Sequence, residues 1–369
     1  MAEKTYRILV INPGSTSTKV GVFDGDREVF TKNVAHEASK LAEFSSVSDQ
    51  MPYRRDMILA ALDENGVALD TIDAFVGRGG GLLSLEGGTY AVNDVMLDHA
   101  YRGANGIQHP AQLGSQLAHE FAAKAGKPAF VVNPPDTDEF CDYARVTGIK
   151  GVYRNAHLHA LNLKETAIRH AHGMGKRYDE CNFIVCHIGG GISISAHRQG
   201  KMIDGYDIVQ GEGAMAPTRC GAVPVAGILD YLEMGHTIKE ARALCMKTGG
   251  FVDLLGTSDA IEVTKRAAEG DKAAARAWGA MLYQLNKYIG SMATVLAGKV
   301  DGILLGGGMV HNKELVASIE ENCGWIAPVS AYPGEFELEA MASGAIRVLN
   351  GEEEPKSYTG VPVFTGFED

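Results

Sequence analysis

The sequence predicts an α/β protein of two related domains, each with a mixed sheet flanked by helices, and three observations support this. The chain has 369 residues, more than one hydrophobic core usually supports. Four apolar runs of strand length each end directly in a glycine-rich turn, and helical patterns fill most of the sequence between them. One strand-turn-strand unit recurs later in the chain, which indicates an internal duplication.

The four apolar runs are the predicted buried strands. They cover residues 8–11, 74–76, 183–186 and 302–305, and the turns that follow contain residues 12–15, 77–81, 187–191 and 306–308. Glycine at the end of a buried strand lets another group approach the backbone closely. The 45 glycines of the chain, about 12% against an average of ~7%, therefore point to binding loops.

The first and third runs look like copies of each other. When the chain is aligned with itself at a shift of 175 positions, residues 8–12 align with 183–187, Gly14 with Gly189 and Gly25 with Gly200. Both copies then continue into a second strand, over 19–23 and 193–197, and a third strand follows a short turn. This pattern predicts two related domains with the same strand order.

Helices are expected where apolar residues recur at helical spacing between capping residues. The predicted helices cover 54–64, 111–125, 156–171, 238–246, 260–269, 272–296 and 337–349. Ser258 or Asp259 caps the fifth of these and Asp271 caps the sixth. The helix 272–296 is apolar enough for the core or for a dimer contact.

Composition excludes several classes of function. The 34 basic and 46 acidic side chains give a net charge of −12, and no basic stripe is present to meet a nucleic acid or an anionic membrane. No apolar stretch reaches the ~20 residues of a membrane helix, and the start of the chain does not resemble a signal peptide. The six cysteines are scattered without a C-x-x-C pair, which favours buried reduced thiols in a cytoplasmic protein.

The segment 12–19, Asn-Pro-Gly-Ser-Thr-Ser-Thr-Lys, is the first candidate for phosphate binding. A tight glycine turn directs backbone N–H groups into one concave site, and the hydroxyl groups and Lys19 add donors. The spacing is not that of a Walker A loop, and a strand rather than a helix follows. An ordinary hairpin is the alternative interpretation of this segment.

Charged residues in other turns are further candidates. Arg78 and Arg219 follow glycine-rich or proline-containing turns, where a guanidinium group can bind carboxylate or phosphate oxygens with two hydrogen bonds. His157 lies at a predicted strand-to-helix junction; His159 follows it, but on a helix the two would point about 200° apart, which disfavours a metal pair. Asp136 lies in a rigid acidic turn. It is either a functional carboxylate or, as is more usual for such a turn, part of a solvated loop or a helix cap.

Taken together, these motifs resemble the acetate and butyrate kinase family. Residues 11–19 (INPGSTSTK) resemble its first signature and residues 186–193 (CHIGGGIS) resemble its second phosphate-binding signature. The resemblance continues in order through Arg78, Asp136, His157, Arg219 and the triglycine turn 306–308. It covers nearly the whole chain and is nearest to the butyrate kinase branch.

The resemblance implies an actin-like ATPase fold, with two duplicated ribonuclease-H-like domains around a central cleft. Residues 1–155 with about 333–369 would form the domain on the acyl substrate side, and 156–332 would form the nucleotide domain and carry dimerisation. The implied reaction is reversible phosphoryl transfer between ATP and a short carboxylate, giving an acyl phosphate and ADP. A homodimer or higher homo-oligomer and a Mg²⁺ ion are also implied, with the helix 272–296 as the candidate dimer element.

The family's functional residues carry over to positions of this sequence. Asn12 would contact the transferred phosphoryl group or Mg²⁺, and it stands where sugar kinases of this fold carry an aspartate. Because a carboxylic acid is already ionised at neutral pH, its phosphorylation needs no strong general base. Arg78 and Arg219 would neutralise the substrate carboxylate and the γ-phosphoryl oxygens, since two anions must meet.

The resemblance implies roles for the remaining candidates as well. His157 would donate a hydrogen bond to the transferred group, Asp136 would orient an arginine or the acceptor, and Glu335, or else Glu337, would hold Mg²⁺. The nucleotide-binding set comprises Ser15, Lys19, His187, Gly189, Gly190, Gly191, Gly306, Gly307 and Gly308.

Small residues near these positions predict the size of the substrate. Gly79 and Gly80 follow the first arginine and Ala156 precedes the histidine, where acetate kinases carry larger side chains. A pocket widened in this way would prefer butyrate or a branched acid of four to five carbons.

Two alternatives remain open. A kinase of the same fold that phosphorylates a hydroxyl group would need a carboxylate base, which Asp136 could supply. A non-catalytic nucleotide-binding regulator would bind ATP without forming an acyl phosphate.

Overall fold

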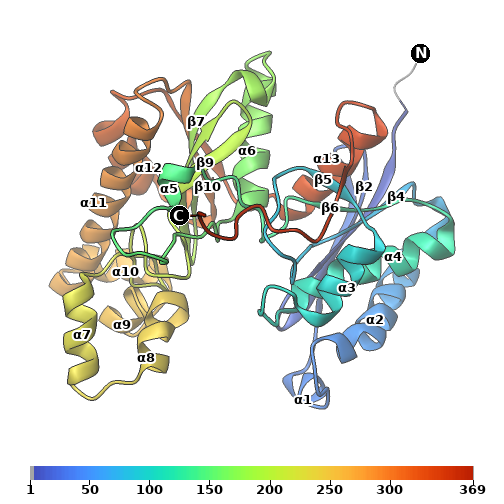
Figure 1. Ribbon diagram of the computed structural model, residues 1–369, viewed down its shortest axis with the longest axis horizontal. Coiled ribbons are helices and arrows are strands. Elements are labelled where there is room, and N and C mark those ends of the chain that lie inside the picture. Colours follow the sequence, from blue (N-terminus) through green and yellow to red (C-terminus); the bar gives the residue numbers. More distant parts are fainter. Residues whose placement is uncertain (1–3, 369) are drawn as a thin grey trace. The chain divides into compact units, whose positions relative to one another are not determined.

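The computed structural model describes residues 4–368 and divides the chain into two compact units (Figure 1). Unit 1 comprises the residues up to 138 together with those from 336 onward, and unit 2 comprises residues 139–335. The division falls before Glu139, whereas the sequence placed it after residue 155. Residues 139–155 join unit 2 because Glu139 accepts a hydrogen bond from Lys164, and the Cys141 amide donates to the Ile203 carbonyl.

Unit 1 contains a seven-stranded mixed sheet with the order β12-β5-β6-β4-β1-β2-β3. Strands β1, β4 and β6 are parallel at its centre, and β2 and β3 continue β1 as an antiparallel meander. The strands are β1 (Arg7–Pro13), β2 (Ser17–Asp24), β3 (Arg27–Ala35), β4 (Ala74–Gly77), β5 (Thr89–Ala91), β6 (Ala129–Val132) and β12 (Lys356–Ser357).

Helices cover both faces of this sheet. The helices of unit 1 are α1 (Ala38–Leu41), α2 (Met51–Glu64), α3 (Asp94–Arg102), α4 (Leu113–Ala125) and α13 (Glu337–Leu349). Successive residues of a strand point to opposite faces. On one face, Leu9 and Phe75 pack in one cluster with Leu117 of α4. On the other face, Gly21 lies so close to α13 that a methyl group on it would contact Leu338.

Unit 2 contains a five-stranded sheet with the order β11-β10-β7-β8-β9. Its strands are β7 (Asn182–Ile188), β8 (Ile192–Arg198), β9 (Lys201–Gly205), β10 (Gly302–Gly307) and β11 (Val329–Pro333). Strands β7, β10 and β11 are parallel, and β8 and β9 are antiparallel. This arrangement repeats that of β1 with β2, β3 and β4 and agrees with the predicted duplication.

The helices of unit 2 also lie on both faces of its sheet. On one face Val185 and Leu304 pack with Leu163 of α6 (Ala160–Gly173). On the other face Ile184 packs with Met281 of α11 (Lys272–Val295). The other helices are α5 (Asp142–Arg145), α7 (Val225–Glu233), α8 (Ile238–Ala243), α9 (Phe251–Leu255), α10 (Ala260–Ala268) and α12 (Lys313–Cys323).

The register shows where the two copies differ. Strands β1 and β7 begin 175 positions apart, as predicted. The last pairs before the turns are Pro13 with Thr18 and Ile188 with Ile192, so the second turn is one residue tighter and the second strands are offset by 174. Gly25 is therefore equivalent to Gln199 and not to Gly200.

Most predicted helices are present, with changes at their starts. Helix α6 begins at Ala160, four residues later than predicted, and α13 has the predicted bounds. Asp259 and Asp271 cap α10 and α11 as expected, because each carboxylate accepts backbone N–H groups of the first turn. Helices α1, α3, α5, α7, α9 and α12 were not predicted, and α1, α5 and α9 have only four, four and five residues.

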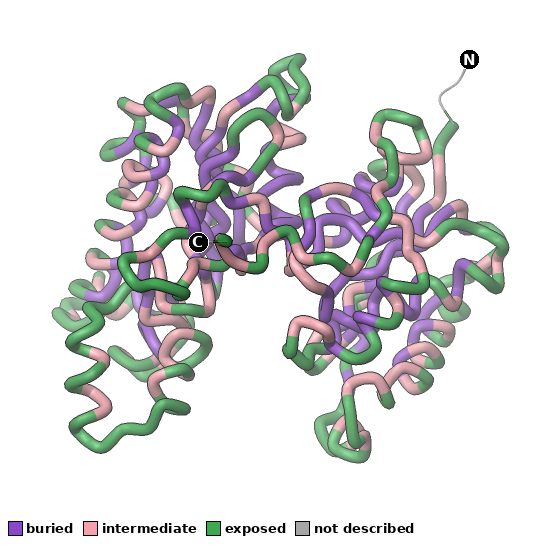
Figure 2. The backbone as a smooth tube through the Cα atoms, in the orientation of Figure 1, coloured by how far each residue is buried: buried purple, intermediate pink, exposed green. Residues whose placement is uncertain are grey.

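Burial follows the sheets (Figure 2). Cys181, Cys186 and Cys323 are buried as expected, whereas Cys141 is exposed and Cys220 and Cys245 are half-buried. All six are free thiols. Over residues 4–368, no helix is both long and apolar enough to span a membrane.

Candidate active site

The candidate residues of unit 1 gather at the carboxyl ends of β1 and β4. Asn12 is half-buried at the end of β1, and its side-chain amide donates to Glu337 Oε2 over 2.8 Å. Arg78 follows β4 directly, and its backbone N–H donates to the Ile11 carbonyl over 2.9 Å. The parallel pairing of the two strands therefore brings Asn12 and Arg78 to the same edge of the sheet.

Arg78 is a buried cation. Its Nη1 donates to the Asn133 carbonyl over 3.2 Å, and only 9% of the residue is exposed. Burial lowers the pKa of Arg78 below its ordinary value, and the negative charges of Glu337 and Asp136 oppose this effect. An arginine held in this way keeps its charge at every working pH and can bind an anion.

Asp136 lies in the loop after β6, as the sequence predicted. Its Oδ1 accepts a hydrogen bond from Asn105 Nδ2 over 2.6 Å, and its carbonyl accepts from the Leu85 amide over 3.2 Å. Its charge acts on Arg78. These contacts suit a positioning role better than that of a solvated loop residue.

The hairpin after β1 carries Ser15 and Lys19, and both are exposed. The turn is closed by the Gly14 amide, which donates to the Ser17 carbonyl over 2.7 Å. Behind it, the fully buried Arg54 donates from Nη1 to Thr18 Oγ1 over 2.9 Å. The hairpin is thus supported from the core while its polar tip stays accessible.

The structure does not support the argument that Gly79 and Gly80 widen a pocket. A methyl group on Gly79 would lie 2.6 Å from Val131 and 2.7 Å from Pro134, and one on Gly80 would lie 3.2 Å from the Gln112 backbone. The space beside both glycines is therefore already filled by protein. Ala156 packs in the apolar core cluster of unit 2.

In unit 2, Arg219 lies directly against the glycine loop that follows β7. A methyl group on Gly191 would overlap Nη1 and Cζ of Arg219. The neighbouring Thr218 donates from Oγ1 to the Gly190 carbonyl over 2.8 Å. Both predicted elements, the loop 189–191 and Arg219, therefore belong to one site.

Burial lowers the pKa of Arg219, and the negative charge of Asp207 opposes that shift. The Arg219 Nε donates to the Met246 carbonyl over 3.4 Å. The guanidinium group is thus held by the backbone on one side and by the glycine loop on the other.

His187 and the triglycine turn 306–308 complete the unit 2 group. The buried His187 ring stacks on His159 with centroids 4.1 Å apart, and its Nε2 lies 3.9 Å from Glu335 Oε1. Gly307 has φ +98°, and a side chain there would collide with the Ile188 backbone. The predicted turn 306–308 is mostly strand, because Gly306 and Gly307 are the last residues of β10 and pair with Tyr332 and Pro333 of β11. Only glycine therefore allows β10 to pass this close to the end of β7.

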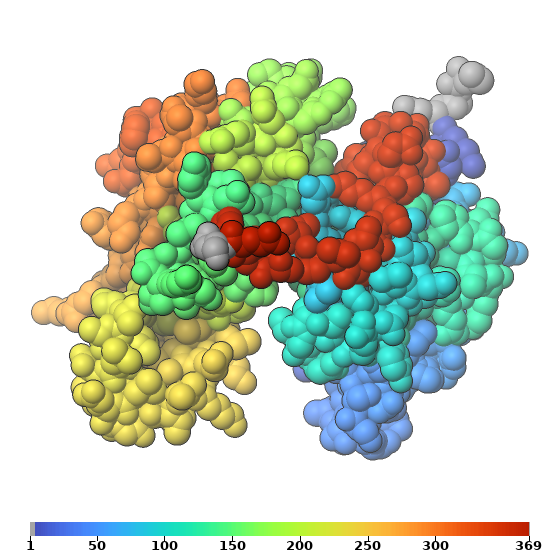
Figure 3. Space-filling model, in the orientation of Figure 1, coloured from blue at the N-terminus to red at the C-terminus, as the bar shows by residue number. Residues whose placement is uncertain are grey.

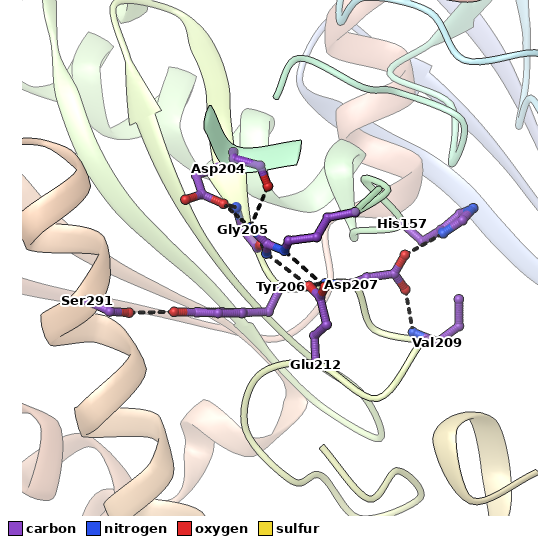
Figure 4. A network of polar contacts seen from close by, with 10 residues as sticks. His157, Asp204, Gly205, Tyr206, Asp207, Val209, Glu212 and Ser291 are labelled. Atoms are coloured by element: carbon purple, nitrogen blue, oxygen red, sulfur yellow. Dashed lines mark hydrogen bonds and ion pairs between the residues drawn. The ribbon is translucent and has the colours of Figure 1, made fainter. Parts of the chain in front are cut away.

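His157 lies in the segment before α6 and not at a strand end, because Tyr153 forms only an isolated bridge with Val146. Its Nδ1 is 2.6 Å from Asp207 Oδ2 (Figure 4). The Ile208 amide donates to the His157 carbonyl over 3.0 Å. The segment is therefore fixed to the loop after β9.

Candidate metal ligands are split between the two units. Glu337 contacts Asn12 in unit 1, whereas Glu335 is exposed beside His187 in unit 2. Within residues 4–368, no group of three or more metal-ligating side chains is present. A metal ion held here would need oxygen atoms from a bound substrate as well, as Mg²⁺ sites commonly do.

The structure thus collects the predicted residues into two groups, one in each unit. Asn12, Arg78 and Asp136 lie together in unit 1, and His157, His187, Arg219 and both glycine turns lie together in unit 2. Sequence reasoning missed Asp207, Asn105 and His159 as their partners. Asp207 has no signal beyond an acidic residue shortly after a predicted strand, which is common in loops.

Comparison with known proteins shows the family of the chain. A model of the Acetokinase family matches residues 150–323. A curated protein named "Probable butyrate kinase" from Clostridium botulinum (strain Eklund 17B / Type B) is 43% identical over 355 residues, which are 96% of this chain and 100% of that protein. The chain belongs to the acetokinase family.

Solved structures of acetokinase-type enzymes share the fold. An acetate kinase from Porphyromonas gingivalis superposes with a TM-score of 0.75 at 19% identity, covering 93% of this chain and 100% of that one. A propionate kinase from Francisella tularensis superposes with a TM-score of 0.70 at 19% identity, covering 92% and 98%. The two duplicated mixed sheets flanked by helices are therefore those of an acetokinase, as predicted.

Proposed function

We propose that this acetokinase transfers the γ-phosphoryl group of ATP to the carboxylate of butyrate, reversibly, giving butanoyl phosphate and ADP. The observation that carries the proposal is the pair of arginines, Arg78 buried beside Asn12 and Arg219 packed on the glycine loop 189–191. The name of the Clostridium relative supports butyrate as the acid.

Carboxylate phosphorylation needs charge neutralisation more than proton transfer. Butyrate is ionised at neutral pH, so its oxygen attacks phosphorus without a base. The residue at the end of β1 is accordingly an amide, Asn12, rather than a carboxylate. Arg78 would bind the substrate carboxylate, and Asp136 would hold that arginine in place through its charge.

The unit 2 group would bind the phosphates of ATP. Backbone N–H groups of Gly189, Gly190 and Gly191 suit phosphate oxygens, and Arg219 beside them would neutralise the charge that spreads over the transferred group in the transition state. His157 would donate a hydrogen bond to one oxygen of that group. The turn 306–308 would pass under the adenosine.

Glu337, rather than Glu335, is the better candidate to hold Mg²⁺. Its carboxylate lies 2.8 Å from the Asn12 amide nitrogen, and oxygen atoms are the ligands that Mg²⁺ prefers. The ion would neutralise phosphate charge, and Ser15 and Lys19 at the hairpin tip would add donors to the nucleotide.

The test is acyl phosphate formation with ATP and Mg²⁺, trapped as the hydroxamate, across acetate, propionate, butyrate, isobutyrate and valerate. The expected rate is highest at four carbons, and Arg78→Ala and Arg219→Ala should each lower it by about a thousandfold. Phosphorylation of a sugar instead would favour the hydroxyl-acceptor alternative. ATP binding without any product would favour the regulatory alternative.

We propose a homo-oligomer formed through α7 and α8. The apolar stripe of α11 packs on the sheet of its own unit, since Trp278, Met281 and Leu285 are buried there. In contrast, α7 has no buried residue, and the space-filling view shows α7 and α8 at the surface (Figure 3). Exposed apolar side chains on and beside these helices are Val225, Leu229, Met234, Ile238 and Met246.

An exposed apolar patch of this kind marks an interaction surface. Sedimentation of the wild-type chain should give a mass above 39.3 kDa, and Leu229→Glu with Ile238→Glu should return it to a monomer. A monomeric wild type would refute this surface.

A further inference from the structure

Asp207 is a buried carboxylate that contacts one candidate catalytic residue and acts on another. Its side chain is fully buried, and Oδ2 lies 2.6 Å from His157 Nδ1. Its charge also raises the pKa of Arg219 against the effect of burial. No predicted role uses this residue.

The carboxylate is fixed on both sides (Figure 4). Its Oδ1 accepts from the Val209 amide over 2.8 Å, and its own amide donates to Glu212 Oε2 over 3.0 Å. Glu212 in turn accepts two hydrogen bonds from Arg154, each 2.9 Å long. Turning the carboxylate away from His157 would break its hydrogen bond from Val209, while Glu212 holds the Asp207 backbone in place.

The contact decides where the imidazole carries its proton. An ionised carboxylate only accepts hydrogen bonds, so His157 Nδ1 must carry the proton. Nε2, on the opposite edge of the ring, then holds a proton only when the ring is positively charged. Asp207 stabilises that charge and also fixes the plane of the ring.

We propose that Asp207 is a positioning residue that presents His157 to the transferred phosphoryl group as a cationic Nε2–H donor. The proposal rests on the proposed function, in which His157 contacts that group. In it, Asp207 acts through His157 and does not touch the substrate. The Asp207 carboxylate then balances the positive charge of the ring before the reaction. In the transition state, the phosphoryl oxygens gain negative charge and the ring stabilises it.

The substitution Asp207→Asn should remove the positive charge of the His157 ring and leave its single proton on Nε2. The Val209 amide needs an acceptor, so the new amide oxygen stays with Val209 and the new NH₂ group faces His157 Nδ1. Nδ1 must then accept, and the proton moves to Nε2 of a neutral ring. The variant keeps the shape of the side chain and loses only the charge.

The protonation of each ring nitrogen is measured by ¹⁵N NMR of the full chain labelled at histidine, with the His157 signals assigned by their loss in His157→Gln. The wild type should show both ring nitrogens of His157 protonated, and Asp207→Asn should show a protonated Nε2 with an unprotonated Nδ1. The control Asp204→Asn changes a carboxylate of the same network that contacts Arg154 and not His157. It should leave the His157 signals unchanged.

Kinetics test whether the effect passes through His157. Asp207→Asn should lower kcat by about a hundredfold and change the KM for ATP by less than about threefold. Added to His157→Gln, the same substitution should lower kcat by less than about threefold further, because the residue it acts through is already gone.

An unprotonated Nδ1 or an unprotonated Nε2 in the wild type, or a full further loss in the double variant, would overturn the proposal. The wild-type spectrum decides this even where Asp207→Asn does not fold. The spectrum does not depend on enzymatic activity. A wild type that forms no acyl phosphate would refute the proposed function, whereas the spectrum tests the contact between Asp207 and His157 by itself.

Discussion

Adding one methyl group at Gly191 should disable Arg219 without unfolding the protein. The methyl carbon would overlap Nη1 and Cζ of Arg219 and would lie 3.1 Å from Nη2. Since nonbonded heavy atoms settle at about 3.5–4.0 Å, the guanidinium group must move by about 2 Å. The end of an arginine side chain can move this far, so the fold should survive.

The catalytic loss follows from that displacement. A misplacement of about 1 Å can already cost about a hundredfold in rate, and an arginine that stabilises the phosphoryl transition state contributes about 10³–10⁵. We expect Gly191→Ala to lower kcat for hydroxamate formation by at least about a hundredfold, while the melting temperature changes by less than about 4 °C.

Two comparisons separate the displaced arginine from other effects of the loop. A methyl group on Gly190 would meet nothing within 4 Å, so Gly190→Ala alters the same loop and leaves Arg219 in place; its loss should be smaller than that of Gly191→Ala. Gly191→Ala combined with Arg219→Ala should be no slower than Arg219→Ala alone. If Gly191→Ala keeps the wild-type kcat, Arg219 does not act from its position on this loop.

Three further predictions follow from other sites. Glu337→Gln should raise the Mg²⁺ concentration needed for half-maximal rate by about tenfold, because Glu337 contacts Asn12 and a carboxylate binds Mg²⁺ more strongly than an amide, whereas Glu335→Gln should change it by less than about threefold. A hydrogen bond from Cys220 lowers the pKa of Cys245 to about 7, so alkylation of Cys245 by iodoacetamide should reach half its maximal rate near that pH, and Cys220→Ala should move this point upward. Burial lowers the pKa of His36 to about 4; the unfolded chain then binds a proton that the folded chain does not, so the free energy of unfolding should fall by roughly 3 kcal/mol between pH 6.5 and 4, and by less in His36→Gln.

Each of these has a contrary outcome. A larger effect of Glu335→Gln than of Glu337→Gln on the Mg²⁺ requirement would return the metal to unit 2. Alkylation of Cys245 that begins only above pH 8 would show that its thiolate is not stabilised. Equal pH dependence of unfolding in the wild type and His36→Gln would show that folding does not lower the pKa of His36.

The strands and the duplication could be predicted because they depend on local sequence. A buried parallel strand is a continuous apolar run, and β1, β4, β7 and β10 each have one followed by glycine. The predicted second strands, 19–23 and 193–197, already lie 174 positions apart, but the alignment of Gly25 with Gly200 missed the one-residue difference between the two hairpin turns. It is a matter of register, which is set by the pairing of Pro13 with Thr18 and of Ile188 with Ile192.

The candidate site was only partly predictable because its contacts join distant segments. Arg219 and Gly191 were each singled out by residue type, but their contact depends on how two loops of unit 2 fold together. The same holds for Asn12, whose partner Glu337 is 325 positions away. The prediction that Gly79 widens a pocket was wrong for the same reason. The sequence does not show that Val131 and Pro134 already fill the space beside this glycine.

The most direct test of the central claim is to follow the reaction of ATP with butyrate labelled with ¹⁸O in both carboxylate oxygens, using ³¹P NMR. If a carboxylate oxygen attacks the γ-phosphorus, butanoyl phosphate appears and its phosphorus resonance shows the isotope shift of one directly bonded ¹⁸O. ADP formation without an acyl phosphate, or an acyl phosphate whose phosphorus carries no ¹⁸O, would contradict the assignment of this chain as a carboxylate kinase.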